Sequence, residues 1–167
     1  LETGITLPFE QNGYLPTPAN RRQRNELNPI AFPEWGWSTG DNVITAIGQG
    51  EVLVTPLQLA NAFATFANGG IRLSPNVVSR VVERDGSVVR QFGPRVLSEV
   101  AIDPGFRWRV LEGLSGVTAD QEGTAYQAFN SLATGGAYFP LETYPVAGKT
   151  GTAEVRGKAD TSLFAAF

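Results

Sequence analysis

Cysteine and histidine are both absent from this chain of 167 residues. Without cysteine, the chain can form no disulfide framework, no thiolate zinc site and no cysteine nucleophile. Without histidine, it cannot by itself supply a Ser-His-Asp or Cys-His catalytic arrangement, or a metal centre with imidazole ligands. We therefore expect this chain to bind no metal and no cofactor.

Excess charge of one sign and long apolar runs are also missing. The 13 Lys and Arg residues against 16 Asp and Glu give a net charge of −3 without a basic run, so we expect no nucleic-acid partner. No stretch of about 18 apolar residues occurs, and the N-terminus lacks a charged flank before an apolar region, so we expect neither a spanning helix nor a signal peptide within these residues. Any membrane anchor is expected upstream.

The 42% hydrophobic content is typical of a globular chain with one core.

The first half of the chain predicts a loop region followed by one strong helix. Residues 1–45 are rich in Pro, Gly, Asn and aromatics and show no sustained period, which predicts a long structured loop. Thr55 followed by Pro56, with Gln58 three residues after Thr55, forms the pattern of a capping box. Apolar residues then recur at helical spacing up to a Gly-Gly stop, so we expect a buried helix over residues 55–70.

The second half predicts a hairpin and a second helix. The segments 77–84 and 87–92 are rich in β-branched residues and flank Asp85-Gly86. That dipeptide predicts a surface hairpin with a two-residue type I′ turn. Asp103-Pro104 repeats the signal of a cap followed by proline, and helical spacing continues to about Thr118.

The C-terminal part predicts a connection and a second hairpin. Residues 119–145 are small, polar and Gly-rich, with one helical turn expected around 125–129. The runs 146–155 and 161–167 predict an antiparallel hairpin. Residues 162–167 carry apolar groups on both strand faces, which is typical of a strand covered on both sides. We therefore expect this chain to be a piece of a larger polypeptide.

One segment carries a chemical motif. Residues 146–154 read Val-Ala-Gly-Lys-Thr-Gly-Thr-Ala-Glu, and glycine is unusual in a strand unless a ligand or another backbone comes close. A phosphate-binding loop that contains Gly148-Lys149-Thr150 requires a glycine five positions before Gly148, where Thr143 stands. Gly48-Gln49-Gly50 is likewise followed by Leu53 where a dinucleotide-binding fingerprint requires glycine. Both nucleotide-binding interpretations fail on spacing.

The Lys-Thr-Gly string resembles the third motif of the penicillin-binding proteins and class A β-lactamases. Taken alone, so short a match is also typical of a solvated lysine on an edge strand. Here several separated segments, in the same order, resemble class B penicillin-binding proteins, the monofunctional peptidoglycan transpeptidases. These segments are 3–16, 46–70, 123–125 and 146–154.

The resemblance implies an α/β (α+β) fold, with a mainly antiparallel sheet sandwiched by helices as in penicillin-binding proteins and β-lactamases. It implies that residues 1–167 are the C-terminal part of one transpeptidase domain, so the fold is incomplete in this chain. The N-terminal part, with the Ser-x-x-Lys and Ser-x-Asn motifs, is expected upstream.

The function implied is that of a penicillin-sensitive DD-transpeptidase, which cross-links D-Ala-D-Ala stem peptides through an acyl-serine intermediate. Expected partners are peptidoglycan stem peptides, β-lactams, the remainder of the same domain and a membrane glycosyltransferase. The expected location is the extracytoplasmic face of the bacterial cell membrane. Two alternatives are a D,D-carboxypeptidase or β-lactamase, which gives the same intermediate to water, and a non-catalytic penicillin-binding sensor or scaffold.

The resemblance also implies roles for the motif residues. Lys149 would hold the active-site hydrogen-bond network and attract a substrate carboxylate, to which the hydroxyls of Thr150 and Thr152 would bind. Gly151 would leave room for substrate, and the backbone N–H of Thr152 would be one of two oxyanion-hole donors. Thr152 could also be an ordinary β-branched strand residue, and Glu154 is expected to form a structural ion pair or face solvent.

No nucleophile of this family is present. Only two lysines exist, Lys149 and Lys158, and the residues three positions before them are Val146 and Val155, so no Ser-x-x-Lys occurs. Ser74-Pro75-Asn76 satisfies the second motif literally. We reject it because it follows the Gly-Gly helix stop, whereas the second motif of the family precedes the Leu-Pro-x-Glu segment.

Overall fold

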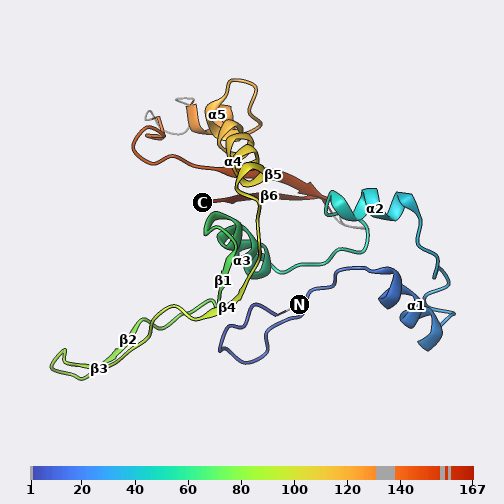
Figure 1. The fold of residues 1–167 in the computed structure, drawn as a ribbon, viewed down its shortest axis with the longest axis horizontal. Helices are drawn as coiled ribbons and strands as arrows, with labels where there is room; N and C mark the ends of the chain where they lie inside the picture. Colours follow the sequence, from blue (N-terminus) through green and yellow to red (C-terminus); the bar gives the residue numbers. More distant parts are fainter. Residues whose placement is uncertain (1, 131–137, 155–156, 158) are drawn as a thin grey trace. The chain divides into compact units, whose positions relative to one another are not determined.

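The computed structural model describes residues 2–130, 138–154, 157 and 159–167 (Figure 1). These residues form five helices and six strands. The elements are α1 (Pro18–Leu27), α2 (Thr39–Ala46), α3 (Pro56–Ala67), β1 (Ile71–Leu73), β2 (Arg80–Val82), β3 (Val88–Gln91), β4 (Val96–Glu99), α4 (Pro104–Ala119), α5 (Tyr126–Asn130), β5 (Gly148–Ala153) and β6 (Thr161–Ala166). The chain divides into two compact units, the first formed mainly by Phe9–Gln58 and the second by Thr3–Pro8 with Leu59–Phe167.

Two helices, α1 and α2, occupy part of the region 1–45, where the sequence predicted only a loop. Each begins with a capping box. In α1 the Thr17 side chain accepts a hydrogen bond from the Asn20 N–H, and in α2 the Ser38 side chain accepts one from the Asp41 N–H. In each box the side chain of the third helical residue accepts a hydrogen bond from the backbone N–H of the cap residue. The loop prediction was wrong because these boxes use Asn and Asp in place of the usual Glu or Gln, and because neither helix buries a residue that would produce an apolar period.

The helix predicted at 55–70 is confirmed as α3. The Gln58 N–H donates to Thr55 Oγ1 at 3.2 Å, and the Thr55 N–H donates to Gln58 Oε1 at 2.9 Å, which is the expected capping box. The expectation of a buried helix is wrong, because no residue of α3 is buried. Phe63 and Phe66 are half-buried against the ring of Phe167, with both centroid distances at 6.4 Å.

The hairpin predicted around Asp85-Gly86 is present as β2 and β3, but its turn differs. The Glu83 N–H donates to the Ser87 carbonyl at 2.8 Å, and the Gly86 N–H donates to the Glu83 carbonyl at 3.0 Å. The loop therefore has three residues, 84–86, and ends with Gly86 at φ +88°. A type I′ turn would also need a positive φ at Asp85, which this residue lacks. The extra residue lets the chain avoid that strained conformation.

Ser74 lies just after β1 and ties two segments of the second unit together. Its hydroxyl donates to the Gly4 carbonyl and accepts from Arg95 Nη2 at 3.0 Å. Arg95 Nη2 also donates to the same Gly4 carbonyl at 2.7 Å. This network gives Ser74 a structural role, in agreement with its rejection as a motif serine.

Helix α4 packs on β5 and α5, and Figure 1 shows it crossing β5. It confirms the helix predicted after Asp103, whose side chain accepts from the Phe106 N–H at 3.0 Å. Helix α5 confirms the helical turn predicted around 125–129, whereas residues 131–137 of the connection lie outside the described part. Strands β5 and β6 confirm the predicted C-terminal hairpin. The described strands form three two-stranded antiparallel sheets among helices, as the mixed fold class predicts.

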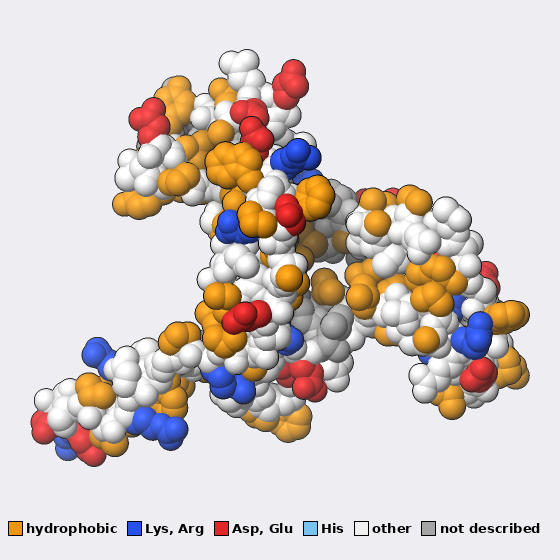
Figure 2. All heavy atoms as spheres, viewed as in Figure 1, with side chains coloured by type: hydrophobic (Ala, Val, Ile, Leu, Met, Phe, Trp, Pro, Cys, Tyr) orange, Lys and Arg blue, Asp and Glu red, His pale blue; other side chains and the backbone are white. Residues whose placement is uncertain are grey.

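Little of the apolar surface is buried within the described residues. Among the described residues, the buried apolar side chains are Pro16, Ala125 and Ala147, and the buried polar side chains are Thr3 and Thr118. Figure 2 shows apolar side chains exposed in many places on the visible face. The final strand is not covered on both sides as expected, because Phe164 is 46% exposed. None of the described helices is long and apolar enough to cross a membrane.

Candidate active site

The hydrogen-bond ladder of the β5–β6 hairpin determines which way the motif backbone faces. The N–H of Ala147 donates to the Phe167 carbonyl at 3.0 Å, and the Phe167 N–H donates to the Ala147 carbonyl at 2.9 Å. Bonded and non-bonded pairs alternate in an antiparallel ladder, and the register has no bulge. The N–H and C=O groups of Gly148, Thr150 and Thr152 therefore point away from β6. No other described strand pairs with β5 along that opposite edge.

The motif side chains divide between the two faces of β5. Alternation places Lys149 and Gly151 on one face, and Thr150 and Thr152 on the other. Lys149 is exposed, and its Nζ donates to the Thr150 carbonyl at 2.7 Å. The ammonium thus reaches the edge opposite β6. The structure therefore gathers the Lys149 ammonium, the Thr150 carbonyl and the Thr152 N–H along one edge.

The two motif glycines have different surroundings. A Cβ added to Gly148 would lie 2.8 Å from Phe164 Cζ and 2.9 Å from the Ala165 carbonyl oxygen, so the neighbouring strand requires glycine there. A Cβ at Gly151 would meet only Leu163 Cβ, at 4.0 Å, which is ordinary contact. Packing within the described residues therefore explains Gly148 and does not explain Gly151.

The segment Gly123-Thr124-Ala125 brings a further hydroxyl to this strand. A Cβ at Gly123 would lie 2.5 Å from the Val117 carbonyl oxygen, so the segment approaches the end of α4 more closely than another residue would allow. Ala125 is buried, and its N–H donates to the same carbonyl at 3.0 Å. In this position Thr124 Oγ1 lies 2.7 Å from Thr150 Oγ1.

A cavity of about 580 Å³ adjoins this arrangement. Its lining comes from the C-terminal half of α4, the following turn and the motif lysine, and consists of Gly113, Gly116, Val117, residues 120–124 and Lys149. Both Thr124 and Lys149 belong to it. The candidate site is therefore a groove beside an edge strand, with an ammonium and a hydroxyl at its wall.

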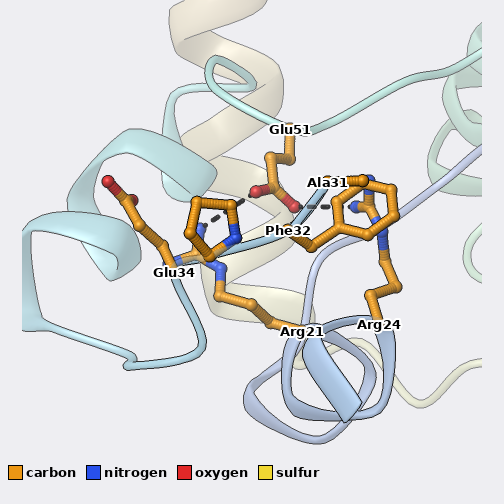
Figure 3. Close-up of a pocket in the computed structure, with 7 residues that line it drawn as sticks. Arg21, Arg24, Ala31, Phe32, Glu34 and Glu51 are labelled. Atoms are coloured by element: carbon orange, nitrogen blue, oxygen red, sulfur yellow. Dashed lines mark hydrogen bonds and ion pairs between the residues drawn. The ribbon is translucent and has the colours of Figure 1, made fainter. Parts of the chain in front are cut away.

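A second cavity, of about 180 Å³, lies in the first unit (Figure 3). Both arginines of its lining are paired with carboxylates: Arg21 Nη1 lies 2.8 Å from Asp41 Oδ1, and Arg24 Nη1 lies 3.2 Å from Glu51 Oε2. Hydrogen bonds from Ser38, together with the Arg21 guanidinium, lower the pKa of Asp41 to about 2. These pairs connect α1, α2 and the chain near Glu51, and the cavity contains no motif residue. The two arginines therefore stabilise the first unit.

The motif strand was predicted from the sequence, but the contact of Thr124 with Thr150 was not. Thr124 was noted only as part of a family-like string, and its proximity to Thr150 has no signal in the local pattern. Glu154 is exposed, in line with the expectation that it faces solvent. The alternative, an ion pair with nearby Arg156, stays a prediction because Arg156 lies outside the described residues.

Comparison with known proteins identifies the family of the chain. The family described as penicillin binding protein transpeptidase domain matches residues 1–167. Peptidoglycan D,D-transpeptidase MrdA of Escherichia coli K12 is 31% identical over 155 residues, which cover 93% of this chain and 22% of that protein. The chain thus spans about a fifth of this relative's length.

Solved structures show the same fold. Penicillin-binding protein 2B from Streptococcus pneumoniae R6 aligns with a TM-score of 0.63 at 24% identity, covering 98% of this chain and 23% of that one. Penicillin-binding protein A from M. tuberculosis, solved as its imipenem acyl-enzyme complex, aligns with a TM-score of 0.63 at 22% identity, covering 99% of this chain and 32% of that one. The chain belongs to the penicillin-binding-protein transpeptidase family, and the three relatives named here are class B members.

Proposed function

We propose that this chain is the C-terminal part of the transpeptidase domain of a penicillin-sensitive peptidoglycan D,D-transpeptidase. One observation carries the proposal: the backbone of Thr150 and Thr152 faces the edge of β5 opposite β6, where the Lys149 ammonium also lies. A substrate backbone or a β-lactam can approach such an edge from the adjoining cavity. The family match over residues 1–167 supports the same conclusion.

The reaction proceeds in two steps through a serine supplied by the upstream part of the domain. The serine Oγ attacks the carbonyl between the two D-Ala residues of the donor, an ester forms, and the terminal D-Ala leaves with a proton on its amine. An acceptor amine then attacks the ester, forms the cross-linking amide and returns a proton to the serine oxygen. A β-lactam stops at the first step, because its amide bond opens without releasing a leaving group.

Each motif residue has a role that fits its position. The Lys149 ammonium raises the local positive potential and orients the hydrogen bonds around the nucleophile. The hydroxyls of Thr150 and Thr152, on one strand face, bind the carboxylate of the terminal D-Ala. The Thr152 N–H, directed away from β6, stabilises the oxyanion of the tetrahedral intermediate. Gly151 leaves the approach to the strand open.

The proposed setting follows from this reaction. The partners are peptidoglycan stem peptides, β-lactam antibiotics, the remainder of the same domain and a membrane glycosyltransferase that supplies glycan strands. The proposed location is the extracytoplasmic face of the bacterial cell membrane, where peptidoglycan is assembled. No resident cofactor is needed for acyl transfer between a serine and an amine.

The direct test uses the full-length enzyme, fluorescent penicillin, and a donor peptide ending in D-Ala-D-Ala with an acceptor amine. We expect covalent labelling and, by mass spectrometry, a cross-linked product. Release of D-Ala with hydrolysed donor alone would identify a carboxypeptidase, and rapid turnover of the penicillin would identify a β-lactamase. Covalent labelling without any reaction of the donor peptide would identify a penicillin-binding sensor, and absence of any label would indicate a non-catalytic scaffold.

The two glycines of β5 provide a matched pair of substitutions. Gly151→Val in the full-length enzyme should slow penicillin acylation by about 10²-fold, because the new side chain displaces the ligand from its reactive position. Its thermal midpoint should stay close to the parental value, since a Cβ there meets only Leu163 Cβ at 4.0 Å. Gly148→Val should instead lower the thermal midpoint. Parental labelling of the Gly151→Val variant would exclude this strand from the binding groove.

A further inference from the structure

We infer that Thr124 is a positioning residue for the proposed reaction: its hydroxyl holds the Thr150 hydroxyl so that the pair presents one O–H to a ligand carboxylate. The inference rests on the proposed function and extends it beyond the Lys-Thr-Gly motif. The observation behind it is the distance of 2.7 Å between Thr124 Oγ1 and Thr150 Oγ1, across 26 positions of the chain.

The two hydroxyls together can donate one hydrogen bond to a ligand. Each hydroxyl carries one proton, and one of the two protons is shared between Thr124 and Thr150, whichever residue donates it. Within the described residues, neither hydroxyl has another protein partner. The second proton therefore remains to be donated to a bound ligand. A hydroxyl that accepts a hydrogen bond becomes a stronger donor, so the pair suits an anionic oxygen better than a single hydroxyl does.

The backbone around Thr124 fixes the position of its hydroxyl. Gly123 lies against the Val117 carbonyl, and the Ala125 N–H is bonded to that carbonyl at 3.0 Å. On the same helix end, the buried Thr118 donates from Oγ1 to the Val146 carbonyl at 2.7 Å, just before β5 begins. The end of α4 thus contacts both the segment that carries Thr124 and the chain just before β5, which carries Thr150. Backbone packing therefore fixes the distance between the two short side chains.

The surroundings identify the ligand chemistry. Thr124 and Lys149 line the same cavity, which is large enough for the end of a peptide or a bicyclic β-lactam. Lys149 is the one cationic residue of this lining, which also contains Asp120 and Glu122. A carboxylate, such as that of a C-terminal amino acid, is therefore favoured at the wall formed by the ammonium and the hydroxyl, and disfavoured beside the two acids. Thr124 would act on this group through Thr150, and not by contacting the scissile bond.

The test compares two variants of the full-length enzyme, Thr124→Val and Thr124→Ser. Valine keeps the shape of threonine and removes the hydroxyl, whereas serine keeps the hydroxyl. We expect Thr124→Val to lower the second-order rate of acylation by benzylpenicillin about tenfold, and Thr124→Ser to restore most of it. With the methyl ester of benzylpenicillin, which lacks the carboxylate charge, parental and Thr124→Val enzymes should react at similar rates.

The outcomes separate this inference from the proposed function. Equal rates for the parental enzyme and Thr124→Val with benzylpenicillin would overturn the positioning role. If Thr124→Val lost a similar factor in rate with benzylpenicillin and with its methyl ester, Thr124 would have a merely structural role and the inference would be overturned. An equal loss in Thr124→Val and Thr124→Ser would overturn it in the same way. A parental enzyme that reacts with no penicillin would contradict the proposed function itself, and with it this inference.

Discussion

Lys149→Ala in the full-length enzyme should slow acylation by fluorescent penicillin on the order of 10²–10³-fold, a loss comparable to the removal of one oxyanion-hole donor. Lys149 is the one lysine among the described residues, and its ammonium donates to the Thr150 carbonyl at 2.7 Å at the edge of β5 opposite β6. Its removal eliminates both the positive potential for the ligand carboxylate and a hydrogen bond at the edge that the ligand approaches. The rate is measured as the second-order constant of covalent labelling.

Lys158→Ala is the matched control, since Lys158 is the other lysine of the chain. It lies outside the described residues and was predicted from sequence to stand in a solvent-exposed turn, so its loss should leave the rate near the parental value. Lys149→Arg should recover only part of the activity, because a planar guanidinium cannot replace a compact ammonium. Equal losses from the two alanine substitutions would refute the assignment of Lys149 to the site.

Local signals allowed the sequence to predict several elements correctly. The Thr55 capping box predicted α3, and Asp103-Pro104 predicted α4, because a helix start depends on residues three positions apart. The β5–β6 hairpin was predicted because two β-rich runs flank a polar turn. In each case the pattern and the interaction that it reports lie within a few residues of one another.

Features that depend on distant contacts could not be predicted. The pattern of residues 146–154 indicates a strand, but which N–H groups face away from the neighbour depends on the register with β6. The sequence does not distinguish Gly148 from Gly151. The close contacts of strand β6, from Phe164 and the Ala165 carbonyl, show that packing requires glycine at 148 and not at 151. The contact of Thr124 with Thr150 likewise depends on how the end of α4 lies against β5.

The 167-residue chain expressed alone should neither unfold cooperatively nor react with penicillin. The buried apolar side chains among its described residues are all small, namely Pro16, Ala125 and Ala147, while Phe106, Trp108 and Phe164 are 67%, 67% and 46% exposed. So little burial cannot offset the conformational entropy of ordering the chain. Covalent reaction also fails, because the sequence contains no serine paired with a lysine three residues later. Thermal unfolding, dye binding to apolar surface and fluorescent penicillin labelling measure these properties.

Adding the separately purified upstream part of the transpeptidase domain provides the control for this prediction. If the two pieces reassemble, the exposed Phe and Trp side chains gain cover, a cooperative unfolding transition should appear, and dye binding should fall. The penicillin label should then appear on the upstream piece, which carries the proposed serine. Lys149→Ala in the 167-residue piece should reduce that labelling without preventing reassembly. A sharp transition and a covalent label on the isolated 167-residue chain would contradict its assignment as one part of a divided active site.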